Sequence, residues 1–140
     1  MDLSQAEGAV EVDLAAGIVG SSTATGFENV TGTVGNDEIS GNDQDNVIRG
    51  GSGNDIRSGG DGADAFVFFE QDIGVDIILD FEIGEDQLLF VTSDPGETNE
   101  TLAAELTQAG EDVELTVNGK TIIFENTDVG DFGAANFLIA

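Results

Sequence analysis

Glycine, aspartate and asparagine recur with a nine-residue period between Gly32 and Phe68. The four successive blocks read GTVGNDEIS, GNDQDNVIR, GGSGNDIRS and GGDGADAFV. Each block has glycine in its first six residues and aspartate or asparagine at its sixth place, and three of the four have an apolar residue at the eighth. A carboxylate beside glycine-rich backbone, whose carbonyls can turn toward one point, supplies the all-oxygen ligand set that Ca²⁺ prefers. The spacing therefore predicts calcium chemistry in the glycine-rich part of each block.

Turns eighteen residues apart should stack on the same edge of a coil, because two nonapeptides make one circuit. An ion between stacked turns would then use Asp37 with Asp55, and the 43–46 turn with Asp64. Stacked carboxylates repel strongly without a cation, so ion binding would remove that repulsion. Continued beyond the blocks, the pattern predicts a further ion between Asp55 and Asp76.

Two more acidic residues, Asp80 and Asp86, follow the blocks in another acidic turn and are candidates for one more site. Several Ca²⁺ ions are therefore expected, held by carboxylates and by the backbone of the glycine-rich turns. The predicted calcium-binding residues are Gly32, Val34, Asp37, Gly41, Asp43, Gly50, Ser52, Asp55, Gly59, Asp61, Asp64, Asp76, Asp80 and Asp86.

The four blocks are not equivalent. Thr33 and Asn42 replace the second glycine of their blocks, and Gln44 replaces the third. Asn46 stands where the acid should be, so the second turn is predicted to be a weaker site. The eighth place of the third block is Arg57, where an inward apolar residue is expected. We interpret this arginine as a packed stem whose guanidinium reaches an edge carboxylate, with a polar contact to a partner or to the adjacent cap as the alternative.

Short strands are predicted between the turns. The last three residues of each block alternate, with the eighth side chain pointing inward and its two neighbours pointing outward, which is the pattern of a half-buried strand. Val30, Ile48 and Phe66 are predicted to point inward from one parallel sheet, and Ile39 and position 57 from the other. The fold class is therefore all-β, a parallel β-roll of nonapeptide repeats. One inward residue per strand gives a narrow core, so the turns need another source of stability.

The segments before and after the blocks are predicted to complete a single domain over residues 1–140. Residues 1–31 form lead-in strands, at Val10–Leu14 and Phe27–Thr31, joined by a small, glycine-rich loop. Residues 32–68 are the repeats, and residues 69–140 form an antiparallel β cap. Within the cap, Asn118-Gly119 between two apolar runs predicts a hairpin with a type I′ turn.

Composition excludes several classes of function. The 140 residues contain 29 acidic and three basic residues, giving a net charge of −26, which makes nucleic acid and anionic membranes poor partners. The chain has no cysteine and no histidine, which excludes most zinc, copper and haem sites and the Ser-His-Asp and Cys-His catalytic systems. No apolar run approaches the length of a membrane span. The first twelve residues lack the basic-then-apolar layout of a secretory signal.

Other readings of the same residues remain open. The acids could form a solvated surface of the kind found in halophiles, and glycine with Asp or Asn could make ordinary turns. Paired carboxylates could suggest glycoside hydrolysis. In a chain with so many acids, however, two carboxylates come close together by chance, so we expect no enzyme. Phe66, Phe68, Phe69 and Phe81 are expected in the core and cap, with a carbohydrate-stacking platform as the alternative.

Taken together, these segments resemble the C-terminal RTX module of serralysin-type secreted proteins. The resemblance rests on VEVDLAAG, GFENVTG, the four blocks, GADAFVF, DIILDFEIGEDQLLF, the ELTQAGEDVELTVNGKTIIFENT hairpin and the ending FLIA. It implies a calcium-binding repeat (also called the hemolysin-type repeat) in a parallel β-roll with a C-terminal β cap. The acidic residue that often precedes the terminal apolar residues in that family is Asn136 here.

The resemblance also implies what the module does. It implies a non-catalytic domain that is disordered in low calcium, folds after export into the extracellular medium, and supports secretion and stability of a larger protein. The implied partners are calcium ions, a type I secretion apparatus that reads a C-terminal signal, and an N-terminal passenger domain. Nothing in the chain matches the protease domain of serralysins. The alternative is a calcium-dependent polysaccharide-binding module, as in similar modules of alginate epimerases.

Overall fold

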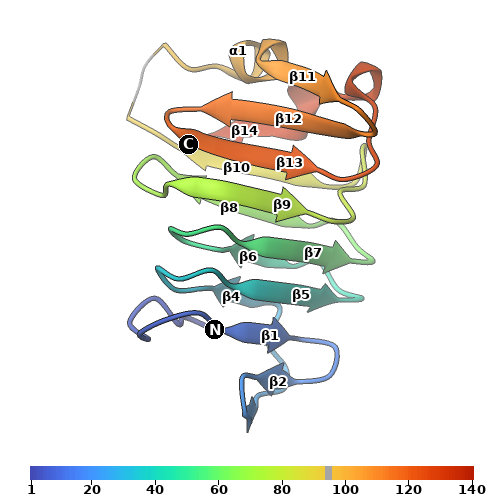
Figure 1. The fold of residues 1–140 in the computed structure, drawn as a ribbon. Helices are drawn as coiled ribbons and strands as arrows, with labels where there is room; N and C mark the ends of the chain where they lie inside the picture. Colours follow the sequence, from blue (N-terminus) through green and yellow to red (C-terminus); the bar gives the residue numbers. More distant parts are fainter. Residues whose placement is uncertain (94–95) are drawn as a thin grey trace.

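The nonapeptide blocks wind into a roll of two facing sheets in a computed structural model, which describes residues 1–93 and 96–140. Each coil contributes one strand to each sheet, and successive coils stack along the axis of the roll (Figure 1). Strands of neighbouring coils pair in parallel. The predicted all-β parallel roll is confirmed.

One sheet has nine strands in the order β11-β12-β13-β9-β7-β5-β1-β2-β3, and the other has five in the order β14-β10-β8-β6-β4. The strands of the nine-stranded sheet are β1 (Glu11–Asp13), β2 (Ile18–Val19), β3 (Ser22–Thr23), β5 (Glu38–Asn42), β7 (Ile56–Gly60), β9 (Gly74–Ile78), β11 (Leu106–Ala109), β12 (Asp112–Val117) and β13 (Lys120–Phe124). Those of the five-stranded sheet are β4 (Asn29–Thr31), β6 (Val47–Arg49), β8 (Ala65–Phe69), β10 (Gln87–Val91) and β14 (Phe137–Ile139).

Two rows of inward side chains run through the core, as the eighth-place period predicted, and the cap strands add further buried residues. In the five-stranded sheet the paired inward residues are Val30, Ile48, Phe66, Leu88 and Phe137. In the nine-stranded sheet they are Val12, Ile39, Arg57, Ile78 and Phe124. Every member is at most 2% exposed. Arg57 is the only charged residue in either row, and it is buried as deeply as its apolar neighbours.

The lead-in adds one more coil to the roll. Residues 1–3 run beside β4, where Leu3 N donates to Thr31 O at 2.8 Å and Thr31 N donates to Met1 O at 2.9 Å. The chain then turns and continues as β1, which pairs in parallel with β5. The segment predicted as a plain loop between the lead-in strands contains the short antiparallel strands β2 and β3. That prediction was wrong in detail, because strands of two residues leave no periodic signal.

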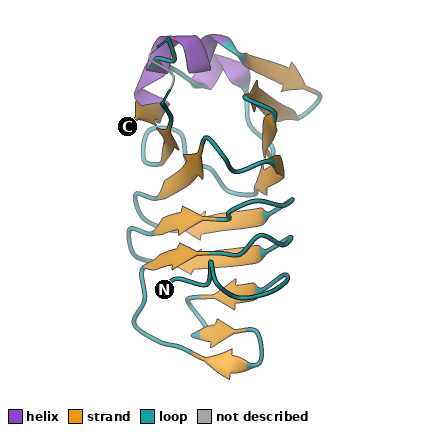
Figure 2. Ribbon diagram, turned by 90° about the vertical axis from the view of Figure 1, so that its left-hand side faces the viewer, coloured by secondary structure: helices purple, strands orange, loops and turns teal. Residues whose placement is uncertain are grey.

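The cap continues both sheets instead of closing them with a separate layer. β11, β12 and β13 are antiparallel, as predicted, and the hairpin turn places Asn118 and Gly119 at φ of 50° and 81°. β13 then pairs in parallel with β9, and β14 pairs in parallel with β10. The helices α1 (Asn99–Ala104), η1 (Val129–Asp131) and η2 (Ala134–Asn136) lie at this end of the roll (Figure 2). No helix in the described ranges is long and apolar enough to cross a membrane.

Aromatic rings fill the junction between the repeats and the cap. Phe81 packs against Phe66, Phe124 and Phe132 with ring centroids 6.0, 5.2 and 5.6 Å apart. Phe68 stacks on Phe90 at 5.3 Å. Because Phe66, Phe68 and Phe81 are at most 5% exposed, these rings are core residues and not a carbohydrate-stacking surface.

Candidate metal-binding turns

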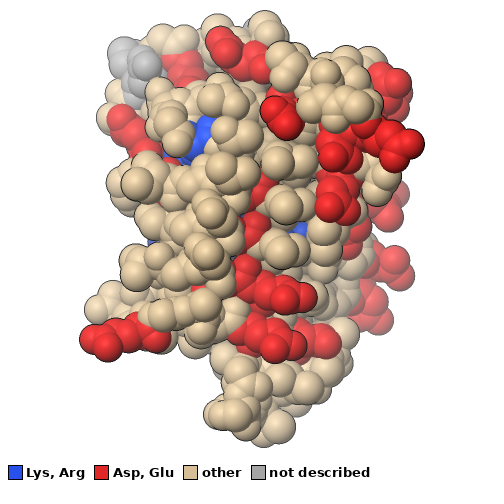
Figure 3. Space-filling model, in the orientation of Figure 1, with Lys and Arg blue, Asp and Glu red and all other residues tan. Residues whose placement is uncertain are grey.

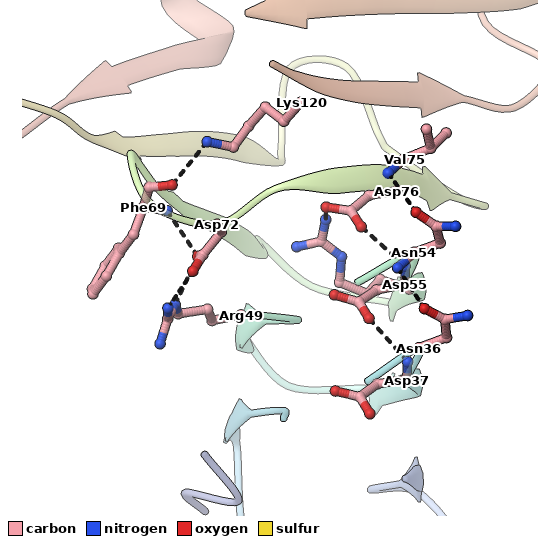
Figure 4. A network of polar contacts seen from close by, with 11 residues as sticks. Asn36, Asp37, Arg49, Asn54, Asp55, Phe69, Asp72, Val75, Asp76 and Lys120 are labelled. Carbon is pink, nitrogen blue, oxygen red and sulfur yellow. Dashed lines mark hydrogen bonds and ion pairs between the residues drawn. The ribbon is translucent and has the colours of Figure 1, made fainter. Parts of the chain in front are cut away.

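The sixth-place side chains connect each turn to its neighbour on the same edge. On the first edge, Asp37 N donates to Asp55 Oδ1 at 2.9 Å, and Asp55 N donates to Asp76 Oδ1 at 3.0 Å (Figure 4). On the opposite edge, Asn46 N donates to Asp64 Oδ1 at 2.8 Å, in the same geometry. The predicted pairing of turns along each edge is therefore present in the fold.

The series continues at both ends of the repeats. In the lead-in coil, Val10 N donates to Asp37 Oδ1 at 2.9 Å, so Val10 takes the sixth-place position without a carboxylate. Toward the cap, Asp64 N donates to Asp86 Oδ1 at 2.9 Å. One oxygen of each sixth-place aspartate thus has a purely structural partner.

A second row of contacts, at the fifth place, runs in the opposite direction along the roll. Asn54 N donates to Asn36 Oδ1 at 2.9 Å, and Val75 N donates to Asn54 Oδ1 at 2.8 Å. On the other edge, Ala63 N donates to Asp45 Oδ1 at 3.0 Å. Sequence reasoning missed this row, although the recurrence of Asn or Asp at the fifth place of three blocks was a usable signal.

Glycine allows the turns to stack this closely. Gly53 has φ of 119°, and a Cβ atom there would lie 2.2 Å from Gly35 O in the turn below. Gly74 has φ of 146°, and its Cβ would lie 1.7 Å from Gly53 O. Real Cβ atoms do not approach backbone oxygen so closely, so the stacking fails with any other residue. The first-place glycines Gly32, Gly41, Gly50 and Gly59 each face the sixth-place side chain of their own turn.

Two sixth-place carboxylates differ from the rest at their second oxygen. Among the residues that the structure describes, Asp55 Oδ2 and Asp64 Oδ2 are buried and accept no hydrogen bond. The two side chains are 0% and 2% exposed. Leaving a buried carboxylate oxygen without a partner is costly unless a cation neutralises it. These atoms belong to the third and fourth blocks, which have glycine at the first, second and fourth places.

The first two turns satisfy their sixth-place side chains internally. Asp37 Oδ2 accepts from Thr33 N at 2.6 Å, and Asp37 Oδ1 also accepts from Thr33 Oγ1 at 2.9 Å. Asn46 Oδ1 accepts from Asn42 N at 2.8 Å, while Asn46 Nδ2 donates to Asn42 Oδ1 at 3.2 Å. The residues that replace the second glycine are therefore the ones that close these turns.

The acids beyond the blocks also have protein partners for both oxygens. Asp76 Oδ2 accepts from Arg57 Nη2 at 2.8 Å, and Asp86 Oδ2 accepts from Glu82 N at 2.8 Å. Asp80 accepts from Gly59 N and Gly60 N at 2.9 and 3.1 Å. All three were predicted as calcium ligands, Asp76 on the edge of Asp55, and in the structure all three accept hydrogen bonds from the chain.

Burial raises the pKa of both Asp55 and Asp64 to about 6. In each case desolvation is the largest cause, the backbone N–H of the stacked turn opposes it, and the neighbouring sixth-place carboxylate adds to it. The charged form of each carboxyl is therefore unfavourable in the folded chain without a cation. A divalent ion at Oδ2 would remove that penalty.

The remaining predicted residues lie in the same turns with their side chains outward. Val34 is 71% exposed, and Asp43 and Asp61 are exposed. Ser52 is partly exposed. Within residues 1–93 and 96–140, no three acidic side chains converge closely enough to hold a metal. An ion at Asp55 or Asp64 would therefore need backbone carbonyls of the turns, which are ligands that calcium accepts.

Acidic side chains gather along the edge where β5, β7 and β9 end, and further acidic groups lie on the lower part of the front (Figure 3). Asp43, Asp45, Asp61, Glu82 and Glu85 are exposed in the turns of that edge. Their summed field raises the local concentration of cations around the turn that contains Asp64.

Comparison with known proteins agrees with this geometry. Residues 31–66 match the model of the RTX calcium-binding nonapeptide repeat, in four copies. The fold is similar to the crystal structure of extracellular lipase LipA from Serratia marcescens, with a TM-score of 0.77 and 21% identity. The match covers 99% of this chain and 21% of the lipase chain, so this chain spans about a fifth of that protein. A search of curated protein sequences finds no match.

Proposed function

We propose, starting from the RTX calcium-binding nonapeptide repeats that make up residues 31–66, that this chain is a non-catalytic module whose folding depends on calcium. The observation that supports this most directly is the pair of buried carboxylate oxygens, Asp55 Oδ2 and Asp64 Oδ2, that have no hydrogen-bond donor among the described residues. Each lies in a complete glycine-rich turn. The donor set, carboxylate oxygen with backbone carbonyls, fits Ca²⁺ and fits no thiolate- or imidazole-seeking metal.

The charge balance explains why folding would require the ion. Bringing a chain of net charge −26 into a compact roll costs electrostatic free energy, and burying Asp55 and Asp64 adds desolvation. Calcium offsets both terms by neutralising carboxylates where they are buried. Because extracellular calcium modules bind in the range of about 10⁻⁴–10⁻³ M, the chain would stay unfolded at cytosolic calcium and fold outside the cell.

This behaviour suits the end of a larger secreted protein. The lipase with the similar fold is extracellular, and the shared fold occupies only part of it. We propose that the module is exported unfolded through a type I secretion apparatus, folds in external calcium, and stabilises an N-terminal passenger domain. The backbone carbonyls of the glycine-rich turns would complete the coordination around the two free oxygens.

A calcium titration of the whole chain tests the proposal. Circular dichroism should change from a coil spectrum in chelator to a β spectrum as calcium rises to millimolar concentration, with magnesium at the same concentration as the control. Calorimetry in parallel should show calcium binding over the same range. A chain that is already fully folded in chelator and shows no calorimetric calcium signal would refute the proposal.

A further inference from the structure

The three basic residues of this chain all contact the segment 69–76, which runs from the end of β8 through a turn into β9. Arg49 Nε and Nη2 donate to Asp72 Oδ2 and Oδ1 at 3.0 and 2.6 Å. Lys120 Nζ donates to Phe69 O at 2.8 Å, and Arg57 donates to Asp76. Figure 4 shows Asp72 in the turn that links β8 to β9, with Phe69 at the end of β8 and Asp76 in β9. With 29 acids spread along the chain, the gathering of every lysine and arginine here is the feature to explain.

This turn is also the first on its edge to depart from the nine-residue pattern. Asp76 follows Asp55 by 21 residues instead of 18, yet Asp55 N still donates to Asp76 Oδ1 as in the repeats. The turn therefore keeps the stacking geometry and the glycine two residues before its aspartate, Gly74, but it lacks the glycines of the first two places. Its carboxylate has the orientation of a sixth-place aspartate, and only the partner of its second oxygen is different.

Arg57 supplies that partner from inside the roll. It lies at the inward eighth place between Ile39 and Ile78 of the neighbouring strands. Its side chain is 1% exposed, and Nη2 lies 2.8 Å from Asp76 Oδ2. The guanidinium carbon lies 4.3 Å from the centre of the Phe68 ring, a cation–π contact that helps to hold a buried positive charge. The guanidinium thus meets the carboxylate oxygen that stays free at Asp55 and Asp64.

We propose that Arg57 is a built-in cation that replaces calcium between the Asp55 and Asp76 turns and ends the ion series on this edge. This inference rests on the proposed calcium function. It adds that no ion binds at the junction between the repeats and the cap, because Arg57 neutralises the Asp76 carboxylate there. Arg49 and Lys120 complete the junction by pairing the second buried carboxylate, Asp72, and the Phe69 carbonyl. The guanidinium of Arg57 would therefore take the place of the calcium ion that the sequence pattern predicted between Asp55 and Asp76.

The test is the number of bound calcium ions, counted by native mass spectrometry of the whole chain at saturating calcium. Arg57→Met keeps an unbranched apolar stem against Phe68 and removes the charge, so it frees Asp76 Oδ2. The variant should bind one ion more than the wild type. Arg57→Lys, which keeps the charge, should bind the same number as the wild type. The double variant Arg57→Met with Asp76→Asn should also return to the wild-type number, because an amide no longer attracts the additional ion.

Each outcome separates this inference from the calcium function. If the wild type binds ions and Arg57→Met binds the same number, the replacement is refuted and the calcium function stands. If Arg57→Met does not fold even in saturating calcium, the replacement is also refuted, because calcium then cannot stand in for the guanidinium. A wild-type chain that binds no calcium refutes the proposed function and this inference together.

Discussion

The turns around Asp55 and Asp64 and the turns around Asp76 and Asp86 have the same stacking geometry but different partners. In all four, Oδ1 of the sixth-place aspartate accepts a backbone N–H from the turn before. The second oxygen accepts from Arg57 or a backbone N–H in the later pair, and from no described residue in the earlier pair. A turn can therefore stack on its neighbour whether or not its aspartate has a free oxygen for an ion.

In the first two turns of the repeats, the sixth-place side chain also has hydrogen-bond partners within the chain. Thr33 and Asn42 replace glycines and donate hydrogen bonds to the side chains at positions 37 and 46. The backbone N–H of each position would also be present in a glycine, whereas the contacts of Thr33 Oγ1 with Asp37 and of the Asn42 side chain with Asn46 would not. In the complete blocks, the second oxygen of the sixth-place aspartate accepts no hydrogen bond from a described residue, which leaves that oxygen to an ion.

A Cβ atom that keeps neighbouring turns apart should disrupt turns with and without a free carboxylate oxygen. We expect this change to cause the largest loss of stability. Gly53→Ala places a Cβ atom against Gly35 O at a φ of 119°, so the turns cannot stack, and the loss of stability in calcium should be at least about 3 kcal/mol. Urea unfolding in saturating calcium measures it. Gly84→Ala is the control, because Gly84 has φ of 100° but no atom near the new Cβ, and strain alone should cost about 1–2 kcal/mol. Equal losses in the two variants would contradict the stacking argument.

Removing one free oxygen should affect only the ion-dependent turns. Asp64→Asn keeps an oxygen to accept from Asn46 N but replaces Oδ2 by an amide nitrogen, and Asp55→Asn does the same on the other edge. Each variant should lose one ion and need at least about tenfold more calcium for half-maximal folding. Asp61→Asn, an exposed acid of the same turn as Asp64, should shift the midpoint far less. If Asp61→Asn matched Asp64→Asn, general acidity would explain calcium binding better than the buried oxygens do.

Acid should partly replace calcium at the same two carboxyls. Their pKa rises from 3.8 in the unfolded reference to about 6 in the calcium-free fold, so the folded state binds more protons than the unfolded state between these values. Stability without calcium is therefore lost as pH rises from 3.8 through 6. In chelator, the folded fraction measured by circular dichroism should be higher at pH 4.5 than at pH 7.

A matched variant isolates those two groups from the other acids of the chain. The double variant Asp55→Asn with Asp64→Asn has no carboxyl to titrate at these positions, so its folded fraction in chelator should depend less on pH over the same window. A calcium-free wild type that loses structure on acidification, or a double variant with an unchanged pH dependence, would show that the two buried carboxyls do not control calcium-free stability.

Converting a self-satisfied turn into an ion-dependent one should have the smallest effect. Asn42→Gly with Asn46→Asp restores the consensus at the second and sixth places and removes the side-chain contact of Asn46 Nδ2 with Asn42 Oδ1. The variant should bind one more ion than the wild type. At a calcium concentration ten times the Kd of the new site, the gain in stability from that ion is about 1.4 kcal/mol. An unchanged ion count by native mass spectrometry would show that these two positions do not decide whether the turn takes an ion.

The nine-residue period was enough to predict the roll, the inward rows and the stacking partners along each edge. Val30, Ile48 and Phe66 pair as their spacing of eighteen required, and the Asn118-Gly119 signal predicted its hairpin. Those features depend on local pattern repeated many times. The calcium ligands stay predictions. Asp55 and Asp64 are the strongest candidates, because their second carboxylate oxygens have no hydrogen-bond partner among the described residues.

What the pattern could not predict depends on contacts between residues far apart in the sequence. Residues 1–3 join the edge of β4 although no strand was predicted there, because an open strand edge offers them unpaired backbone groups. Arg57 was expected to reach an edge carboxylate, and it does, but its complete burial follows from the row of side chains around it. The partners at the second oxygens of Asp37 and Asp86 are backbone N–H groups, which no side-chain pattern reveals.

The most direct test of the central claim is the anomalous diffraction of calcium in crystals of the whole chain grown in millimolar calcium. Peaks beside Asp55 Oδ2 and Asp64 Oδ2, with none between Asp55 and Asp76 where Arg57 lies, are the predicted result. Crystals without a peak at Asp55 and Asp64, or with an ion bound to Asp76 in the presence of Arg57, would contradict the account.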